Sequence, residues 1–383
     1  MAESPRQTVR TVEEVQQALT AEASSASAEA LRLNLVHLLT LAIERHASDL
    51  HLAVATPPLL RIDGTLVRME CPSLMREESK RLIYSLLTDH QKAQFEREQE
   101  LDFSMAIKDL GRFRVNVHSQ RGSVEAAIRI VPPQVRPLEE LGLPSVVADL
   151  ARKPHGLVLV TGATGMGKTT TLAAMIELIN RERGAMILVI EDPIEYVFRH
   201  QRSIVKQREV SADTKSFAEA LRRSLRQDPN VIVIGDMRDL ETMAAVLTAA
   251  ETGHLVLASL HTPDAPQTID RIIDVFPLHQ QQQVKIQLSD CLEGVISQQL
   301  LPRADRPGRV LACEVMVATP AVRTLIRGHA TPQLPSAIQA GAAQGMCTMD
   351  DSLKDLCERG IISYETAISR AKHPQAFLSL KDR

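Results

Sequence analysis

From residue 156 onward, short unbroken apolar runs alternate with longer segments of helical periodicity. The apolar runs are Leu157–Val160, Met186–Ile190, Val231–Ile234 and Leu255–Leu260. Unbroken apolar runs of this length are typical of strands buried on both faces, so the pattern predicts a parallel sheet flanked by helices. Polar residues follow each run, at the carboxyl ends of the strands, where open α/β sheets bind their ligands.

The preceding part of the chain has a different pattern, which predicts a separate, smaller α/β domain. Its expected elements are a helix over Leu31–Arg45, a strand over Leu50–Val54, a hairpin over Leu59–Val67, a helix from Arg76 to about Glu96, and strands over Phe113–Val117 and Val124–Val131. The hairpin is predicted because Asp63-Gly64 suits a two-residue turn between strands.

Composition and turn residues divide the chain into three parts. Residues 1–30 are rich in Ala, Ser and Glu and are expected to form a flexible tail. Pro132-Pro133, Pro137 and the segment Leu141–Pro144 indicate a linker. We therefore expect an N-terminal domain over 31–135 and a second domain, ending in helices, over 136–383.

The overall composition disfavours several classes of protein. The formal net charge is −3 and aromatic residues make up 3%, with no Trp, so no nucleic-acid partner is expected. Charges near the N-terminus argue against a signal peptide, and no apolar run approaches the ~18 residues of a membrane span. Five cysteines without a CxxC pair indicate reduced thiols in the cytoplasm; they are Cys71, Cys291, Cys313, Cys347 and Cys357.

The strongest chemical signal follows the first apolar run. Gly162-Ala163-Thr164-Gly165-Met166-Gly167-Lys168-Thr169 fits the P-loop pattern GxxxxGK[ST], between a predicted strand and a predicted helix that continues through Thr170. In this motif backbone N–H groups hold phosphates, the lysine reaches the β- and γ-phosphates, and the Thr hydroxyl binds Mg²⁺. ATP and Mg²⁺ are therefore the expected ligands. The alternative, a glycine-rich turn with a solvated lysine, is disfavoured because a chance match in such a chain has odds on the order of one in a hundred.

Three further strand ends supply candidate catalytic residues. Asp236 follows an apolar strand in the position that usually handles Mg²⁺ and water. Glu191 ends another strand and could order the attacking water, whereas its neighbour Asp192 precedes a proline and suits a turn. His261, at the carboxyl end of its strand, can approach a γ-phosphate. His254, about 23 Å away at the other end of that strand, suits a structural role and cannot share a metal ion with His261.

These motifs together resemble the type II/type IV secretion ATPase superfamily, and within it the pilus-retraction branch. The residues that carry the resemblance, from about residue 35 to 370, are Gly162–Thr169, Ile190–Tyr196, Gly235–Thr242, Ala250–Thr262, Ala47–Leu52, Arg112–Asn116, Leu225–Pro229 and Thr319–Arg327. The resemblance implies a PAS-like N-terminal domain, a RecA-like P-loop ATPase domain and a homohexameric ring. It also implies docking on the inner-membrane pilus platform from the cytoplasm, with ATP hydrolysis driving depolymerisation of pilin.

The resemblance further assigns arginines of the N-terminal domain to the nucleotide site. Arg112, Arg114 and Arg121 occupy the matching region, and an arginine can stabilise charge on the transferred phosphoryl group. The alternative is that arginines alternating along a strand form its solvated face.

One residue departs from the family pattern. The family has Gly-Glu-Met/Leu-Arg-Asp where this chain has Gly235-Asp236-Met237-Arg238-Asp239, so the acid is one methylene shorter. A misplacement of ~1 Å can lower a rate on the order of 10²-fold. Two interpretations follow: an autonomous retraction motor, or an accessory nucleotide-binding paralogue that depends on a partner ATPase.

Overall fold

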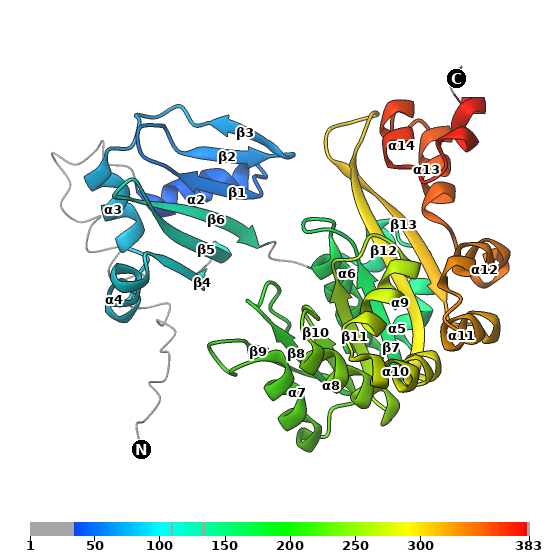
Figure 1. The fold of residues 1–383 in the computed structure, drawn as a ribbon. Coiled ribbons are helices and arrows are strands. Elements are labelled where there is room, and N and C mark those ends of the chain that lie inside the picture. Colours follow the sequence, from blue (N-terminus) through cyan, green and yellow to red (C-terminus); the bar gives the residue numbers. More distant parts are fainter. Residues whose placement is uncertain (1–33, 109, 132–134, 381–383) are drawn as a thin grey trace. The chain divides into compact units, whose positions relative to one another are not determined.

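The computed structural model describes residues 34–108, 110–131 and 135–380 (Figure 1). The chain forms two compact units, and the boundary between them lies between residues 134 and 135. The expected tail (1–30), the start of the helix expected from Leu31 and the Pro132-Pro133 part of the linker lie outside the described residues. No helix in the described ranges is long and apolar enough to cross a membrane.

Within residues 34–131, a six-stranded antiparallel sheet has the order β3-β2-β1-β6-β5-β4. Its strands are β1 Asp49–Leu52, β2 Leu59–Ile62, β3 Thr65–Arg68, β4 Glu100–Ile107, β5 Gly111–Gln120 and β6 Ser123–Val131, and its helices are α2 Leu35–Glu44, α3 Arg76–Tyr84 and α4 Asp89–Glu98. Alternate strand residues such as Leu50, Val115 and Ile128 are fully buried in one cluster with the helices. This architecture fits a PAS-like α/β domain.

The sequence pattern predicts the hairpin of this unit correctly, and the described part of the helix expected over Leu31–Arg45 forms α2, but the helical region after Arg76 differs from the prediction. Asp63 and Gly64 both have positive φ, 47° and 86°, as the predicted two-residue turn requires. The single helix expected over 76–96 is wrong, because a second helix begins after Thr88. The Thr88 hydroxyl accepts from the Gln91 N–H and the Gln91 side chain accepts from the Thr88 N–H, a capping box that starts α4. Strand β4 is an addition to the predicted set.

Within residues 135–380, a seven-stranded sheet has the order β13-β12-β7-β11-β10-β8-β9. Its strands are β7 Gly156–Thr161, β8 Met186–Glu191, β9 Ile204–Glu209, β10 Val231–Ile234, β11 Leu255–Leu260, β12 Leu292–Pro302 and β13 Arg309–Val317. The four apolar runs of the sequence form β7, β8, β10 and β11, which are parallel neighbours at the centre, as predicted. The strands β9, β12 and β13 are additions, and because β13 is antiparallel to β12 the whole sheet is mixed.

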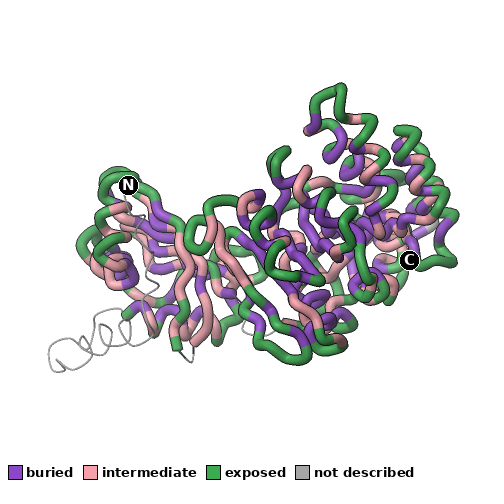
Figure 2. The backbone as a smooth tube through the Cα atoms, turned by 90° about the horizontal axis from the view of Figure 1, so that it is seen from below, coloured by how far each residue is buried: buried purple, intermediate pink, exposed green. Residues whose placement is uncertain are grey.

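Helices cover both faces of this sheet. The α-helices are α5 Val146–Ala151, α6 Lys168–Glu182, α7 Phe217–Ser224, α8 Leu240–Glu251, α9 Ala265–Asp274, α10 Leu278–Cys291, α11 Pro320–Arg327, α12 Leu334–Ala340, α13 Met349–Glu358 and α14 Tyr364–Arg370; the 3₁₀-helices are η1 Leu138–Leu141, η2 Leu225–Gln227, η3 Thr331–Gln333, η4 Ala342–Gln344 and η5 Pro374–Leu380. Alternate residues of β7 point to opposite faces. Leu157 and Leu159 join the cluster with α8 and α9, and Val158 and Val160 join the cluster with α6. Figure 2 shows the buried residues, coloured purple, along the backbone of this second unit.

Candidate nucleotide site

The strand order brings the predicted site residues of the second unit to one edge of the sheet. The strands β7, β11, β10 and β8 are consecutive neighbours and run parallel, so their carboxyl ends share that edge. The P-loop follows β7, His261 follows β11, Asp236 follows β10 after one residue, and Glu191 ends β8. The predicted phosphate-binding loop and three polar side chains therefore lie at the ends of adjoining strands.

The P-loop turns directly from β7 into α6, whose first residue is Lys168. Gly162 has φ +139°, and a Cβ at this position would lie 2.5 Å from the carbonyl oxygen of Gln298 in β12. Only glycine fits this close approach between loop and strand. Gly165 and Gly167 also have positive φ, and the loop ends at the N-terminus of α6, where unpaired N–H groups favour an anion. All nine residues predicted to bind nucleotide, Gly162 to Thr170, belong to this loop and the first turn of α6.

The side chain of Lys168 is buried against the loop. Its Nζ donates to the carbonyl oxygens of Gly162 at 2.7 Å and Ala163 at 3.0 Å, and lies 3.3 Å from Nδ1 of His261. Burial lowers the pKa of Lys168, and the negative charges of Asp236 and Glu195 oppose that effect. An ammonium that is poorly hydrated and held by weak carbonyl acceptors is well suited to transfer its hydrogen bonds to phosphate oxygens.

His261 joins the lysine to the acid. Its Nε2 lies 3.0 Å from Oδ2 of Asp236, while its Nδ1 faces the ammonium of Lys168. Asp236 as a carboxylate accepts and the lysine donates, so both contacts are satisfied by the imidazole that carries its proton on Nε2. By contrast, His254 contacts the carbonyl oxygen of Ala249, at the end of α8, through Nδ1 at 3.0 Å. This contact is structural, as the sequence suggests.

Asp236 has one engaged and one unengaged carboxylate oxygen. Its Oδ2 accepts from His261 and from Nε of Arg238, the latter at 2.5 Å. Its Oδ1 is buried and has no hydrogen-bond partner among the described residues. A buried carboxylate oxygen without a donor is an available ligand for a hydrated Mg²⁺ or for a water molecule. The motif that contains Arg238 is recognisable in the sequence, but nothing in the pattern indicates this contact.

The two acids at the end of β8 differ in exposure. Glu191 is buried, at 8% exposed, whereas Asp192 is exposed. A Cβ at Gly235 would lie only 3.3 Å from Cα and Cγ of Glu191, so a glycine lets the ends of β8 and β10 approach closely. Glu191 is thus the acid of this pair that faces the neighbouring strand end.

Residues next to the P-loop form hydrogen bonds that the sequence motif does not predict. The Thr170 hydroxyl lies 3.1 Å from the Tyr196 hydroxyl, and the Gln298 side chain donates to the Thr171 hydroxyl at 2.7 Å. Thr161 donates to Ser297, again in β12. These partners are 26 to 136 residues apart in sequence, so only the tertiary structure reveals them.

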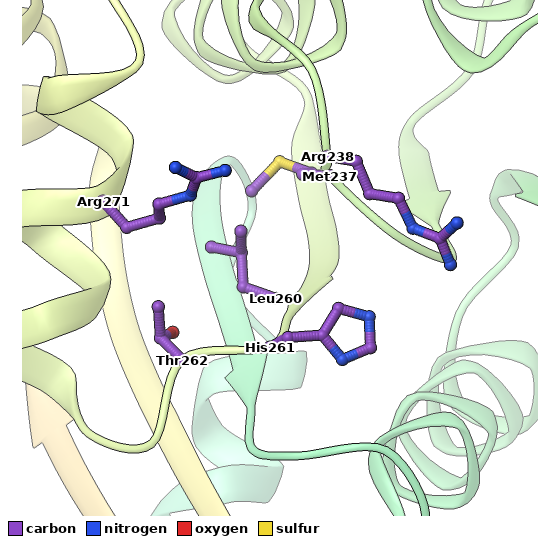
Figure 3. Close-up of a pocket in the computed structure, with 6 residues that line it drawn as sticks. All are labelled: Met237, Arg238, Leu260, His261, Thr262 and Arg271. Atoms are coloured by element: carbon purple, nitrogen blue, oxygen red, sulfur yellow. The ribbon is translucent and has the colours of Figure 1, made fainter.

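A pocket of about 220 Å³ adjoins the Asp236–His261 pair. It is lined by Met237, Arg238, Leu260, His261, Thr262 and Arg271. Figure 3 shows Arg271 entering from α9, with Arg238 and the His261 ring extending toward the opposite side. Because His261 both lines this pocket and contacts Asp236, a group bound here would lie beside the candidate catalytic pair.

The three predicted arginines belong to the N-terminal unit, and one of them lies apart from the other two. Arg112 and Arg114 are half-buried on β5, on the face opposite its fully buried residues, and Arg114 pairs across the sheet with Arg129. Arg121 is exposed in the turn between β5 and β6, with φ 49°. Seven residues of strand separate Arg114 from Arg121, roughly 23 Å, so these two cannot contact the same phosphate group.

Comparison with known proteins identifies similar chains. The model of the family described as "Type II/IV secretion system protein" matches residues 24–346. The "Type IV pilus retractation ATPase PilT" of Pseudomonas aeruginosa is 46% identical over 90% of this chain and 100% of its own length. A "Twitching motility protein" of Neisseria gonorrhoeae is 45% identical over 88% of this chain and 90% of its own.

A solved structure extends the likeness to three dimensions. The "Crystal Structure of the Pilus Retraction Motor PilT and Bound ADP" superposes with a TM-score of 0.82 at 47% identity, covering 90% of this chain and 98% of that one. These matches confirm the resemblance to the pilus-retraction branch that the motifs indicate, and they confirm the two-domain α/β fold class.

Proposed function

This chain belongs to the type II/IV secretion system protein family, and we propose that it is an ATP-hydrolysing motor subunit that powers retraction of a type IV pilus, and hence twitching motility. The observation that carries the proposal is the contact of Lys168 of the P-loop with His261, which in turn contacts Asp236. Through His261, the P-loop is thus connected to a carboxylate that can orient a water molecule.

In this proposal each residue at the sheet edge has one task. The N–H groups of the loop and of the first turn of α6 bind the phosphates, and Lys168 exchanges its carbonyl acceptors for β- and γ-phosphate oxygens. Asp236 and Glu191 orient the attacking water. His261 contacts the γ-phosphate, and its hydrogen bond to Asp236 makes the position of that carboxylate depend on whether the γ-phosphate is bound.

Mg²⁺ would be held by the Thr169 hydroxyl and, through water, by Asp236, whose Oδ1 is buried without a donor. When bound, the ion neutralises charge that develops on the phosphates. We expect Asp236→Asn to raise the Mg²⁺ concentration for half-maximal turnover on the order of 10-fold, as loss of an outer-sphere partner commonly does. Asp192→Asn, at the end of the neighbouring strand, is the matched control. An unchanged Mg²⁺ dependence in Asp236→Asn would remove this residue from the metal site.

The proposed motor works as a homohexameric ring. The N-terminal unit of one subunit would close over the nucleotide of another, with Arg112 and Arg114 approaching the phosphates and Arg121 contributing from the distant turn. Closing and reopening successive sites would rotate the domains as rigid bodies and act on the pilus platform at the cytoplasmic side of the inner membrane. Light scattering of the purified chain with ATP and Mg²⁺ tests the ring, because a mass below six subunits would contradict it.

A second candidate function rests on the shortened acid. With Asp236 in place of the glutamate of the family pattern, the chain could bind nucleotide and the platform yet depend on a paralogous pilus ATPase for turnover. The two functions differ in whether the isolated chain hydrolyses ATP.

The cellular test uses a strain of the source organism that lacks this gene. Complementation with the wild-type gene should restore twitching and shorten surface pili, and complementation with Lys168→Ala should not. Lys354→Met, on the helix α13, serves as a control for expression and should complement fully. A deletion strain that twitches normally would refute the proposed function.

A further inference from the structure

The N-terminus of α9 is held by two buried carboxylates from different parts of the unit. Asp264, the N-cap of α9, is 6% exposed, and its Oδ1 accepts from the Gln267 N–H at 2.9 Å. Glu314 of β13 is 3% exposed, and its Oε1 accepts from the Ala265 N–H at 2.8 Å. Both acids therefore bind N–H groups of the same first turn, which begins shortly after His261.

A single ammonium from the C-terminal region lies between these carboxylates. Nζ of Lys372 is 2.9 Å from Oδ2 of Asp264 and 3.7 Å from Oε2 of Glu314. Burial works to lower the pKa of Lys372, but its hydrogen bond to Asp264 and the neighbouring negative charges raise the pKa overall. Without this cation two buried acids would face each other at the start of a helix, an arrangement that buried groups tolerate poorly.

The backbone at Lys372 is bound by a third carboxylate, that of Asp350. The N–H groups of Lys372 and His373 donate to the two carboxylate oxygens of Asp350, at 2.8 and 2.9 Å. Asp350 lies in the first turn of α13, which packs on β13, where the Ser352 hydroxyl accepts from the Cys313 N–H (Figure 1). Lys372 thus connects the C-terminal helices α13 and α14 to α9.

Movement of this helix end would be passed to the catalytic strand end. The Thr262 hydroxyl lies 2.7 Å from the Thr268 hydroxyl, which donates to the carbonyl oxygen of Asp264 at 2.6 Å. Thr262 directly follows His261, whose ring makes 3.0 and 3.3 Å contacts with Asp236 and Lys168. These contacts connect the first turn of α9 to the segment that carries the His261 ring.

We propose that Lys372 is a positioning residue for ATP hydrolysis: by binding Asp264 and Glu314 it fixes the start of α9, and through it the His261–Thr262 segment, from the C-terminal helices. The inference rests on the proposed ATPase function. It requires the rate of turnover, rather than the affinity for nucleotide, to depend on the charge at position 372.

The test measures steady-state ATP turnover and the Kd of a fluorescent ATP analogue for the full-length chain and five variants. Lys372→Met should lower kcat on the order of tenfold, as small displacements of catalytic groups do, with the Kd changed less than about twofold. Lys372→Arg, which keeps the charge and can reach both acids, should recover most of kcat. Lys354→Met, elsewhere in the C-terminal helices, should match the wild type.

Asp350→Ala releases the backbone of 372–373 while keeping the lysine charge, and it keeps the inference testable if Lys372→Met does not fold. It should lower kcat in the same direction by a smaller factor. An active wild type with unchanged kcat in Lys372→Met, or in Asp350→Ala when Lys372→Met is unfolded, would overturn the inference. So would a parallel loss of kcat and nucleotide affinity that Lys372→Arg does not recover. A wild type no faster than Lys168→Ala would instead refute the autonomous ATPase.

Discussion

The Nε2 atom of His261 lies 3.0 Å from Oδ2 of Asp236, and the two residues follow neighbouring parallel strands. The contact gives the imidazole a defined tautomer, with its proton toward the acid and a lone pair toward Lys168. A change at the phosphate that draws Lys168 away from His261 would therefore be felt at Asp236. In the proposed mechanism, the His261 ring would connect sensing of the γ-phosphate to the orientation of water by Asp236.

Replacement of His261 tests this link. We expect His261→Ala to lower kcat for ATP on the order of 10- to 100-fold, because Asp236 loses a donor and the strand end loses its contact with Lys168. The Kd for ADP should change less than about threefold, since the P-loop N–H groups remain. His254→Ala, at the other end of β11, is the control. Equal effects of the two substitutions on kcat would argue against a specific role for His261.

Alanine substitutions at two glycines of the P-loop, Gly162 and Gly165, separate the cost of backbone strain from the cost of a steric clash. Gly165 has φ +81°, and a Cβ added there would meet no atom within 4 Å, so Gly165→Ala should lower the free energy of unfolding by about 1 kcal/mol through strain alone. Gly162→Ala adds a Cβ 2.5 Å from the Gln298 carbonyl oxygen and should lower it by about 3 kcal/mol. Urea denaturation of both variants gives the comparison, and a smaller loss for Gly162→Ala would contradict the packing of the loop against β12.

The ionisation of Glu314 makes the free energy of unfolding depend on pH, in a direction that its pKa shift determines. Burial raises the pKa of Glu314, against the opposing effects of the Ala265 N–H and Lys372. The folded state then binds this proton more tightly than the unfolded state, so the contribution of Glu314 to stability is complete below its unfolded pKa, near 4.5, and is lost as pH rises through the folded pKa.

Glu314→Gln removes this ionisation and keeps an oxygen for the Ala265 N–H. The free energy of unfolding of Glu314→Gln, relative to the wild type, should therefore increase as pH rises from about 4.5 toward 7. Denaturant titrations across that range measure the difference. A difference that stays constant with pH, or that falls, would contradict a raised pKa at Glu314.

The parts of the fold that the sequence predicts are those with strong local signals. Four unbroken apolar runs predict the buried strands β7, β8, β10 and β11, and the P-loop motif predicts the turn from β7 into α6. The strand β12 has a polar interior, with Ser297 and Gln298 both buried, and lacks the apolar signature. Its polar side chains are buried because they bind Thr161 and Thr171 beside the P-loop, which is a tertiary effect.

In the candidate site, too, the sequence predicts some residues but not the contacts that depend on packing. The sequence predicts Lys168, Asp236 and His261 from their places after strands, because parallel strands bring their carboxyl ends to one edge. It does not predict that Arg238 binds Asp236, or that Lys372 lies between Asp264 and Glu314, since these contacts depend on how loops and terminal helices pack. The assignment of Arg112, Arg114 and Arg121 to the nucleotide site stays a prediction.

Steady-state ATP turnover by the purified chain, measured beside Lys168→Ala and Asp236→Glu, tests the central claim most directly. An autonomous motor predicts turnover that Lys168→Ala abolishes and that Asp236→Glu leaves unchanged or raises. Wild-type turnover equal to that of Lys168→Ala, and restored only by Asp236→Glu, would contradict the claim and identify an accessory subunit driven by a partner ATPase.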